Sequence, residues 1–175
     1  MIKTKPTDYI RTVQDYPVPG VNFYDINSLF AHPIWQHYSE LLATQIQTTD
    51  NQPTHIVGIE SRGFVVGAVL ATIIGVPFVM VRKKGSKYPG SLFEESYGTE
   101  YSKDTLVLQK DVLGSSDQIL IVDDLIATGG SMLATKRLVE QAQAKVVGFA
   151  SIINLSYLNT DHIKKESVIT LEEIK

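Results

Sequence analysis

The chain has 175 residues, 43% of them hydrophobic and 20% charged, which fits one globular domain and excludes a disordered chain. Sixteen Lys and Arg against nineteen Asp and Glu leave a net charge of −3 and a pI of about 5.8, which argues against a nucleic-acid-binding domain. Because the sequence contains no cysteine, a disulfide scaffold, a zinc ribbon and a cysteine nucleophile are all excluded.

The N-terminal region is polar and carries Pro17, Pro19 and Gly20. This composition predicts a small cap, here called the hood, at about residues 1–32 of a single domain that spans 1–175. The region lacks the apolar run of a secretory signal peptide, so we expect a cytoplasmic protein.

One stretch could be mistaken for a membrane span. No charged residue occurs from Gly63 to Val81, and the length of this stretch is close to that of a transmembrane helix. Gly75 and Pro77 interrupt it, however, and proline ends a helix while permitting a strand to start. We therefore expect a buried helix followed by a buried strand, and no association with a membrane.

Short apolar runs alternate with helix-length segments along most of the chain. This pattern predicts an α/β fold with an open, mostly parallel twisted sheet flanked by helices. Apolar residues in the predicted strands run almost continuously, as expected where helices cover both faces of a sheet. The expected strands are His55–Glu60, Phe78–Arg82, Gln118–Asp123 and Val146–Leu155, and the expected helices are Pro33–Gln47, Phe64–Ile74 and Gly130–Gln143.

Residues 85–117 differ from the rest, because small, polar and charged residues dominate and only Thr105–Gln109 resembles a strand. Excursions of this length between core strands are usually lids or disordered loops. We therefore expect a flexible lid loop at about residues 85–105.

The segment Ile119–Ser131 reads ILIVDDLIATGGS: an apolar strand, two acids, and a turn that opens a helix. Ligands of open parallel sheets bind beyond the carboxyl ends of the strands, where Asp123 and Asp124 would lie. Two adjacent carboxylates there can accept hydrogen bonds from neighbouring hydroxyls or hold a hydrated Mg²⁺ ion.

The turn Thr128–Ser131 is suited to an anion. It supplies consecutive backbone N–H groups at the amino end of a helix, and its glycines allow a phosphate to approach the backbone closely. A Gly-Gly turn or an Asp-Asp pair is commonplace when it occurs alone. The two joined after a buried strand favour a site for a sugar phosphate.

These residues resemble the phosphoribosyl pyrophosphate motif of the type I phosphoribosyltransferases, and the match is complete over Val122–Ser131. Within that family the chain is similar to the members that use adenine as the acceptor base. The resemblance spans most of residues 8–160. The segments that carry it are Asp15–Ile26, Gly58–Phe64, Arg82–Gly85, Glu95–Tyr101 and Val122–Met132.

The resemblance implies roles for the groups that hold the sugar and its phosphates. Asp123 and Asp124 would bind the ribose hydroxyls, and would hold Mg²⁺ through water and those hydroxyls. A cis peptide bond would precede Ser61. The 5′-phosphate would lie on Ala127, Thr128, Gly129, Gly130 and Ser131. The pyrophosphate would lie on Glu60, Ser61, Arg62, Arg82 and Lys83.

The resemblance also implies a base site and a catalytic set. Glu100, in the lid, would assist removal of a proton from the purine. The catalytic residues would be Glu100, Arg62, Asp123 and Asp124. Adenine would contact Asn22, Phe23, Tyr24 and Leu155.

Three positions differ from the pattern of the adenine-specific members. Tyr24 stands where they commonly have Arg, Asn154 stands where they have an acid, and an extra residue in Gly85–Gly90 aligns Lys87 only loosely with their loop lysine.

The resemblance implies a homodimeric, Mg²⁺-dependent enzyme of purine salvage that converts adenine and phosphoribosyl pyrophosphate to AMP and pyrophosphate. A hypoxanthine or guanine phosphoribosyltransferase remains the nearest alternative. A non-catalytic regulator that binds phosphoribosyl pyrophosphate through the same loop is the alternative from another class.

Overall fold

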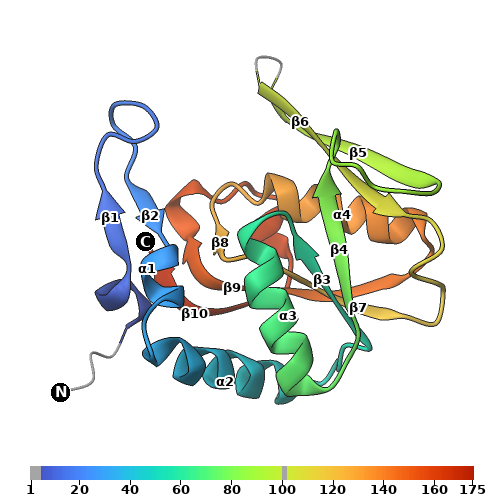
Figure 1. Ribbon diagram of the computed structural model, residues 1–175, viewed down its shortest axis with the longest axis horizontal. Helices are drawn as coiled ribbons and strands as arrows, with labels where there is room; N and C mark the ends of the chain where they lie inside the picture. The colour runs from blue at the N-terminus through green and yellow to red at the C-terminus, as the bar shows by residue number, and fades with distance from the viewer. Residues whose placement is uncertain (1–4, 100–101) are drawn as a thin grey trace.

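The computed structural model describes residues 5–99 and 102–175. Within that part of the chain, eight strands form one sheet in the order β10-β9-β7-β3-β4-β6-β5, with β8 beside β9 (Figure 1). The pairs from β10 to β4 are parallel, and the two pairs made by β6 are antiparallel, which confirms the predicted mostly parallel sheet. The strands are β3 (His55–Ile59), β4 (Phe78–Lys83), β5 (Leu92–Thr99), β6 (Ser102–Gln109), β7 (Gln118–Val122), β8 (Leu125–Ile126), β9 (Lys145–Leu155) and β10 (Val168–Ile174).

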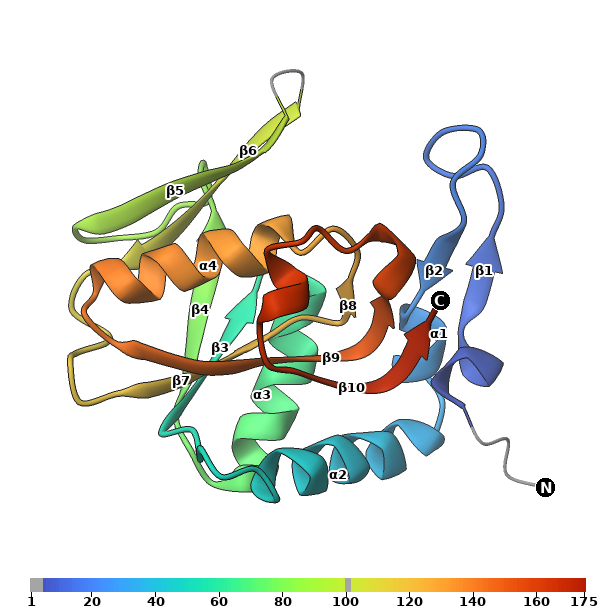
Figure 2. The same cartoon turned by 180° about the vertical axis from the view of Figure 1, so that it is seen from behind.

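Helices cover both faces of the sheet. Helices α2 (Ile34–Gln47) and α3 (Arg62–Ile74) lie on one face, and α4 (Gly130–Gln141) lies on the other (Figures 1 and 2). In β7, Ile119 packs with the α4 side and Leu120 with the α2–α3 side, and both are buried. Successive side chains of a strand point to opposite faces, so a strand buried on both faces needs the continuous apolar run that predicted it.

The hood forms a separate two-stranded sheet at one end of the molecule (Figure 1). Strand β1 (Arg11–Val13) pairs antiparallel with β2 (Phe23–Asp25), and a short helix α1 (Asn27–Phe30) follows. The predicted cap is thus a hairpin that stands apart from the main sheet.

The expected strands and helices all occur, with ends that shift by one or two residues. Helix α3 begins at Arg62, two residues before the predicted start, and α4 ends at Gln141. The stretch from Gly63 to Val81 divides into α3 and β4 as expected. No helix within residues 5–99 and 102–175 is long and apolar enough to cross a membrane.

The segment expected to be a loop contains a long hairpin instead. Strands β5 and β6 pair from Leu92 with Gln109 to Thr99 with Ser102, and the predicted run Thr105–Gln109 is the second half of β6. The expectation of a structureless loop was therefore wrong over residues 92–99 and 102–104, while the strand-like run 105–109 is confirmed. Polar and charged residues are common in this hairpin because it packs against the protein on one side only.

Candidate active site

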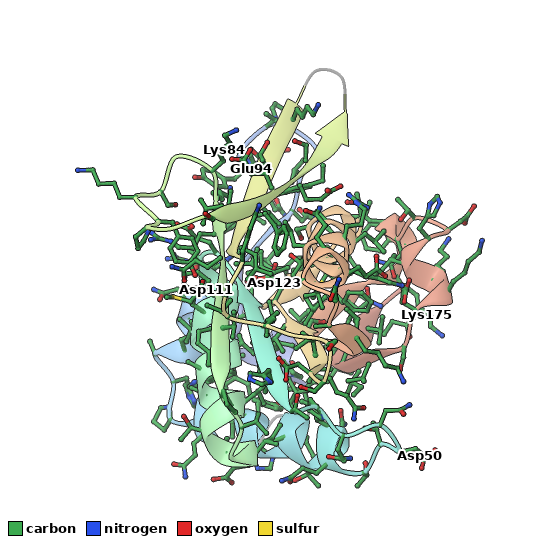
Figure 3. The ribbon with its side chains drawn as sticks, turned by 90° about the vertical axis from the view of Figure 1, so that its right-hand side faces the viewer. Asp50, Lys84, Glu94, Asp111, Asp123 and Lys175 are labelled. Carbon is green, nitrogen blue, oxygen red and sulfur yellow. The ribbon has the colours of Figure 1, made fainter. Side chains whose placement is uncertain are left out.

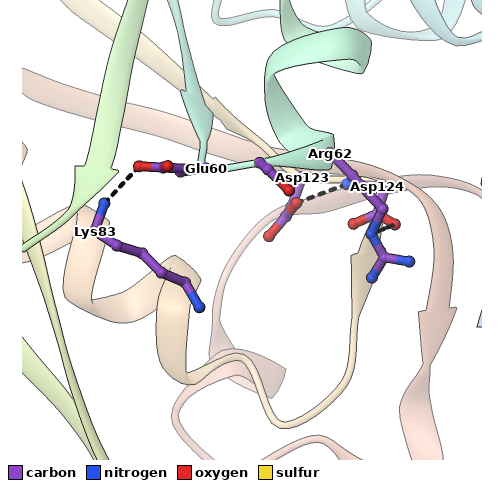
Figure 4. A pocket seen from close by; sticks show the side chains of 6 residues that line it. Glu60, Arg62, Lys83, Asp123 and Asp124 are labelled. Atoms are coloured by element: carbon purple, nitrogen blue, oxygen red, sulfur yellow. Dashed lines mark hydrogen bonds and ion pairs between the residues drawn. The ribbon is translucent and has the colours of Figure 1, made fainter. Parts of the chain in front are cut away.

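Three parallel strands, β3, β4 and β7, end at the same edge of the sheet. The residues at and just after these ends surround a cavity of about 340 Å³ (Figure 4). The sequence predicted that several of them would meet here, and the structure brings them together. The lining residues are Glu60, Ser61, Arg62, Lys83, Asp123 and Asp124, and this space is called the polar cavity below.

The two aspartates lie at the carboxyl end of β7. The backbone N–H of Asp124 donates to Asp123 Oδ1 at 2.9 Å, and Arg62 Nε lies 3.0 Å from Asp124 Oδ2. The Asp124 side chain is only 4% exposed, whereas that of Arg62 is 39% exposed. None of the described residues donates a hydrogen bond to Asp124 Oδ2, so its contact with Arg62 is an ion pair without a hydrogen bond.

Gly63 allows the first turn of α3 to lie against the end of β7. A Cβ atom at Gly63 would lie 2.9 Å from both Asp123 Oδ1 and the Val122 carbonyl oxygen, closer than such contacts occur. The sequence Ser61-Arg62-Gly63 therefore places Arg62 beside Asp124 because Gly63 has no side chain. The peptide bond between Glu60 and Ser61 is cis, as the family resemblance implied.

Burial raises the pKa of both aspartates. For Asp123, the negative charge of Asp124 adds to the effect of burial on the pKa. For Asp124, the Arg62 guanidinium lowers the pKa but offsets burial only in part. Two adjacent carboxylates, one half-buried and one buried, that line the same cavity are suited to bind hydroxyl donors or a cation.

The Glu60 carboxylate is bound by neighbouring residues at the ends of β3 and β4. Burial raises the pKa of this carboxyl, but hydrogen bonds from the Lys83 backbone N–H at 2.8 Å and from Ser86 Oγ at 3.1 Å, together with Arg82, lower it further than burial raises it. Arg82 Nε lies 3.5 Å from Glu60 Oε2. The Glu60 side chain therefore joins the ends of β3 and β4.

The structure separates Arg82 from Lys83. Lys83 lines the polar cavity, and its Nζ lies 3.9 Å from Asp104 Oδ2 on β6. Arg82 is not among the lining residues, and its guanidinium carbon lies 5.4 Å from the centre of the Tyr88 ring. Consecutive strand residues point to opposite sides, so the two cations cannot both face this cavity.

The predicted phosphate turn forms the amino end of α4. Gly129 has a φ of +83°, and a Cβ atom there would lie 2.6 Å from the Ile163 side chain, so only glycine fits. The Gly130 N–H donates to Thr128 Oγ1 at 3.3 Å. The first bond of the helix runs from Leu133 N–H to the Gly129 carbonyl, so the amides of Ser131 and Met132 precede it.

Two residues that sequence reasoning missed hold this turn from outside. Asn159 Nδ2 donates to the Ala127 carbonyl at 2.6 Å, and both the N–H and the hydroxyl of Thr160 donate to the Thr128 carbonyl. The carbonyls of the turn are thereby occupied, while the amides at the start of the helix are the groups that can bind an anion. A short polar segment after β9 was the only sequence signal for this contact.

A second cavity, of about 510 Å³, lies between the hood and the sheet and shares Arg62 with the polar cavity. The Arg62 guanidinium carbon lies 5.3 Å from the centre of the Phe23 ring, and Nη1 donates to the Tyr24 carbonyl at 3.4 Å. This space is called the base cavity below. Its lining includes the predicted residues Asn22, Phe23, Tyr24 and Leu155, together with Gly20, Val21, Leu125, Ala127 and the unpredicted Tyr157 and Leu158.

Two of the singled-out residues, Lys87 and Asn154, lie elsewhere. Glu100 lies outside the described residues. Lys87 is exposed and lines neither the polar nor the base cavity. Asn154 is buried beside β10 and also lines neither cavity, and no described residue hydrogen-bonds to its Oδ1.

Residues 25–172 match the model of the phosphoribosyl transferase domain, and the chain belongs to this family of phosphoribosyltransferases. Within the family it is similar to adenine phosphoribosyltransferases. The protein of that name from Bacteroides thetaiotaomicron is 42% identical over 180 residues, which cover 98% of this chain and 100% of that protein.

Solved structures show the same similarity over the whole fold. Adenine phosphoribosyltransferase from Rhodothermus marinus has a TM-score of 0.82 and 42% identity, covering 95% of each chain. The Saccharomyces cerevisiae enzyme, solved with an imino-altritol bisphosphate and adenine, has a TM-score of 0.81 and 33% identity, covering 93% of this chain and 94% of that one.

Proposed function

We propose that this protein transfers 5-phosphoribose from phosphoribosyl pyrophosphate to adenine, which yields AMP and pyrophosphate and salvages the purine. The observation that carries the proposal is that Arg62 lines both cavities, one with two aspartates and the other with Phe23 and Leu155. The transfer requires the ribose phosphate and the flat base to be held next to each other, so that the base can reach ribose C1. Two adjoining cavities can hold them in that arrangement. The names of the relatives support the same reaction.

In this proposal the ribose 5-phosphate lies across the end of β7 and the start of α4. The amides at the amino end of α4 and the hydroxyls of Thr128 and Ser131 hold the phosphate, where the helix dipole favours negative charge. Asp123 and Asp124 accept hydrogen bonds from the ribose hydroxyls. The phosphate residues are Ala127, Thr128, Gly129, Gly130 and Ser131.

The pyrophosphate lies in the polar cavity, where Ser61, Arg62 and Lys83 can donate to it. Glu60 shapes this cavity and does not donate to the pyrophosphate, because its N–H donates to the Val81 carbonyl and its carboxylate is bound by Lys83, Ser86 and Arg82. Arg82 adds positive charge near the rim of the cavity without facing it.

The acid pair fits Mg²⁺. Asp124 Oδ2 is already paired with Arg62, so Asp123, which also lines the polar cavity, would supply the carboxylate nearer to the ion, through water and the ribose hydroxyls. No group of three or more possible metal-ligating side chains occurs among those residues, which suits an ion that keeps several waters and takes substrate oxygens. Bound there, Mg²⁺ would neutralise charge on the pyrophosphate.

The base cavity holds the purine between the Phe23 ring and Leu155, and the backbone of Asn22 and Tyr24 contacts its edge. Tyr24 takes part through its backbone, so the absence of Arg at this position leaves adenine recognition intact. The Tyr24 carbonyl accepts from Arg62, which fixes the orientation of this edge. Because the Ile26 N–H also donates to the Tyr24 carbonyl, the Asn22 carbonyl would be the acceptor for the amino group of adenine, which favours adenine over a 6-oxopurine.

In the reaction, the bond between ribose C1 and the pyrophosphate oxygen breaks, a bond forms from purine N9 to C1, and the N9 proton leaves the base. Positive charge develops on the ribose, so the adjacent aspartates stabilise the transition state while Arg62 and Lys83 stabilise the leaving pyrophosphate. Glu100 is the proposed proton acceptor, and this role rests on the family resemblance alone.

We extend the proposal to the assembly: one phosphoribosyltransferase domain over residues 1–175, acting as a homodimer in the cytoplasm without nucleic acid or membrane. Exposed apolar side chains on α3 and β4, namely Val65, Ile73 and Met80, support a surface that a second copy could cover.

The test is steady-state kcat/KM with adenine, hypoxanthine, guanine and xanthine at saturating phosphoribosyl pyrophosphate. We expect adenine to exceed each oxopurine by about 100-fold or more, because a misplaced hydrogen-bonding group leaves buried polar groups unpaired. A preference for an oxopurine would overturn the choice of base but not the transfer reaction. Binding of phosphoribosyl pyrophosphate without turnover of any base would favour the regulator instead.

A further inference from the structure

The β5–β6 hairpin presents one of its faces to α4. Side chains alternate along β5, and Phe93 and Tyr97 pack into the hydrophobic cluster on the α4 side of the sheet. Glu95 lies between them on the same face. Glu94 points the other way, and its Oε2 lies 2.6 Å from Lys84 Nζ (Figure 3).

Glu95 is bound by two residues of α4. Arg137 Nε donates to Glu95 Oε1 at 2.5 Å, and Gln141 Nε2 donates to Oε2 at 3.1 Å. Arg137 Nη2 also donates to the Ser96 carbonyl at 3.4 Å. Residues 137 and 141 are one helical turn apart, so both reach the same carboxylate, and both of its oxygens are engaged. The hairpin is therefore fastened to α4 at Glu95.

Two residues further along β5, Tyr97 lies over the amino end of α4. A Cβ atom added to Gly130 would lie 3.3 Å from Tyr97 Cδ2, so the ring is in van der Waals reach of the turn. The Tyr97 hydroxyl lies 3.4 Å from Asp104 Oδ2, and the same oxygen lies 3.9 Å from Lys83 Nζ. Tyr97 thus stands between the phosphate turn and a residue of the polar cavity.

We infer that Glu95, held by Arg137 and Gln141, is a positioning residue that fixes the Tyr97 ring over the amino end of α4 and thereby shapes the 5′-phosphate site. The inference rests on the proposed function, which places the 5′-phosphate at this turn. The ring shields the hydrogen bonds between the phosphate and the turn from water, and such bonds are stronger where the local dielectric constant is low. Glu95 acts only through Tyr97.

The test measures the Kd for ribose 5-phosphate by calorimetry, and separately the KM for phosphoribosyl pyrophosphate and for adenine. Tyr97→Ala should raise the Kd for ribose 5-phosphate and the KM for phosphoribosyl pyrophosphate roughly tenfold. It should leave the KM for adenine within about twofold of the wild type. Tyr97→Phe keeps the ring and should resemble the wild type. Glu95→Gln should raise the same two constants by roughly three- to fivefold.

A double variant separates positioning from a general loss of stability. If Glu95 acts through Tyr97, adding Glu95→Gln to Tyr97→Ala should change the Kd no further. Arg137→Lys, which keeps the charge, should weaken ribose 5-phosphate binding less than Arg137→Met does. Glu94→Gln is the matched control, since it breaks an ion pair on the opposite face of the same strand and should leave the Kd unchanged.

Unchanged binding in both Tyr97→Ala and Glu95→Gln, additive effects in the double variant, or an equal rise in KM for both substrates would each overturn the inference. Failure of the proposed function is distinguishable, because the wild-type protein would then form no AMP. In that case the ribose 5-phosphate measurements still decide whether Glu95 and Tyr97 shape a phosphate site.

Discussion

Arg62 and Asp124 form an ion pair, with Nε 3.0 Å from Oδ2, although one begins α3 and the other follows β7. The same guanidinium contacts the Phe23 ring and the Tyr24 carbonyl in the hood. A single side chain therefore joins the acid pair, the polar cavity proposed for the pyrophosphate, and the base cavity, and its planar shape suits all three contacts.

Substitution of Arg62 should therefore lower activity even when the charge is kept. We expect Arg62→Lys to lower kcat/KM by roughly 100-fold, because an ammonium group cannot contact Asp124, the ring and a phosphate together. Arg62→Met should lower it further. Steady-state kinetics check this, and an Arg62→Lys variant within threefold of the wild type would contradict the role.

Asp124→Asn should lower turnover by roughly 100-fold or more, because the amide cannot supply the negative charge that stabilises the ribose cation. Asp161→Asn, on a side chain that is 90% exposed, is the control and should keep full activity. Near-wild-type turnover of Asp124→Asn would remove Asp124 from the catalytic set.

The same substitution should stabilise the fold at neutral pH. Folding raises the pKa of Asp124, so the folded state binds the proton more tightly, and the free energy of unfolding falls as pH rises through the folded pKa. At pH 8 we expect Asp124→Asn to be more stable than the wild type by about 0.5–2 kcal/mol. Urea unfolding at several pH values checks this, and the gain should shrink as pH falls toward the ordinary pKa of Asp. A stability difference between the variant and the wild type that grows as pH falls would contradict this prediction.

Gly129→Ala should both destabilise the protein and weaken phosphate binding. The φ of +83° disfavours alanine, and the new Cβ would meet Ile163, so we expect a loss of about 2–4 kcal/mol. Gly75→Ala is the matched control, since Gly75 also has a φ of +83° but has open space around it. Equal losses of stability in the two variants would show that contact with Ile163 does not constrain the turn.

Glu100→Ala should reduce kcat by roughly 100-fold without a change in thermal stability, if this residue takes the proton from the purine. The pH dependence of kcat should lose its acidic limb in the variant. A variant with the turnover and pH profile of the wild type would show that another group accepts the proton.

The parts of the fold that follow local patterns could be predicted from the sequence. The strands before Glu60 and Asp123 are continuous apolar runs, and the turn before Ser131 combines glycines with the start of a helix. These signals depend only on residues close in the chain. They placed the acid pair and the phosphate turn at one edge of the sheet, and the structure confirms that position.

Strand β10 was missed for a different reason. Glu172 and Glu173 interrupt its apolar pattern, and the strand is stabilised by pairing with β9 at the edge of the sheet. Strand β5 and the first residues of β6 were missed because contacts with α4, such as Glu95 with Arg137, are distant in sequence. Pairings of this kind depend on the tertiary fold, which propensity and periodicity do not encode.

Two residues predicted to share one site point in different directions, and the alternation of side chains along a strand could have predicted this. Arg82 and Lys83 were assigned together, yet alternation along a strand turns only Lys83 into the polar cavity. The hydrogen bonds of Asn159 and Thr160 to the phosphate turn could not have been foreseen, because the short polar segment after β9 does not indicate which segment it contacts.

A crystal structure of the protein with AMP tests the central claim most directly. The account predicts the 5′-phosphate on the amides of residues 128–131, the ribose hydroxyls on Asp123 and Asp124, and the purine between Phe23 and Leu155. A nucleotide whose phosphate lies away from the amino end of α4, with neither aspartate near its ribose, would contradict it.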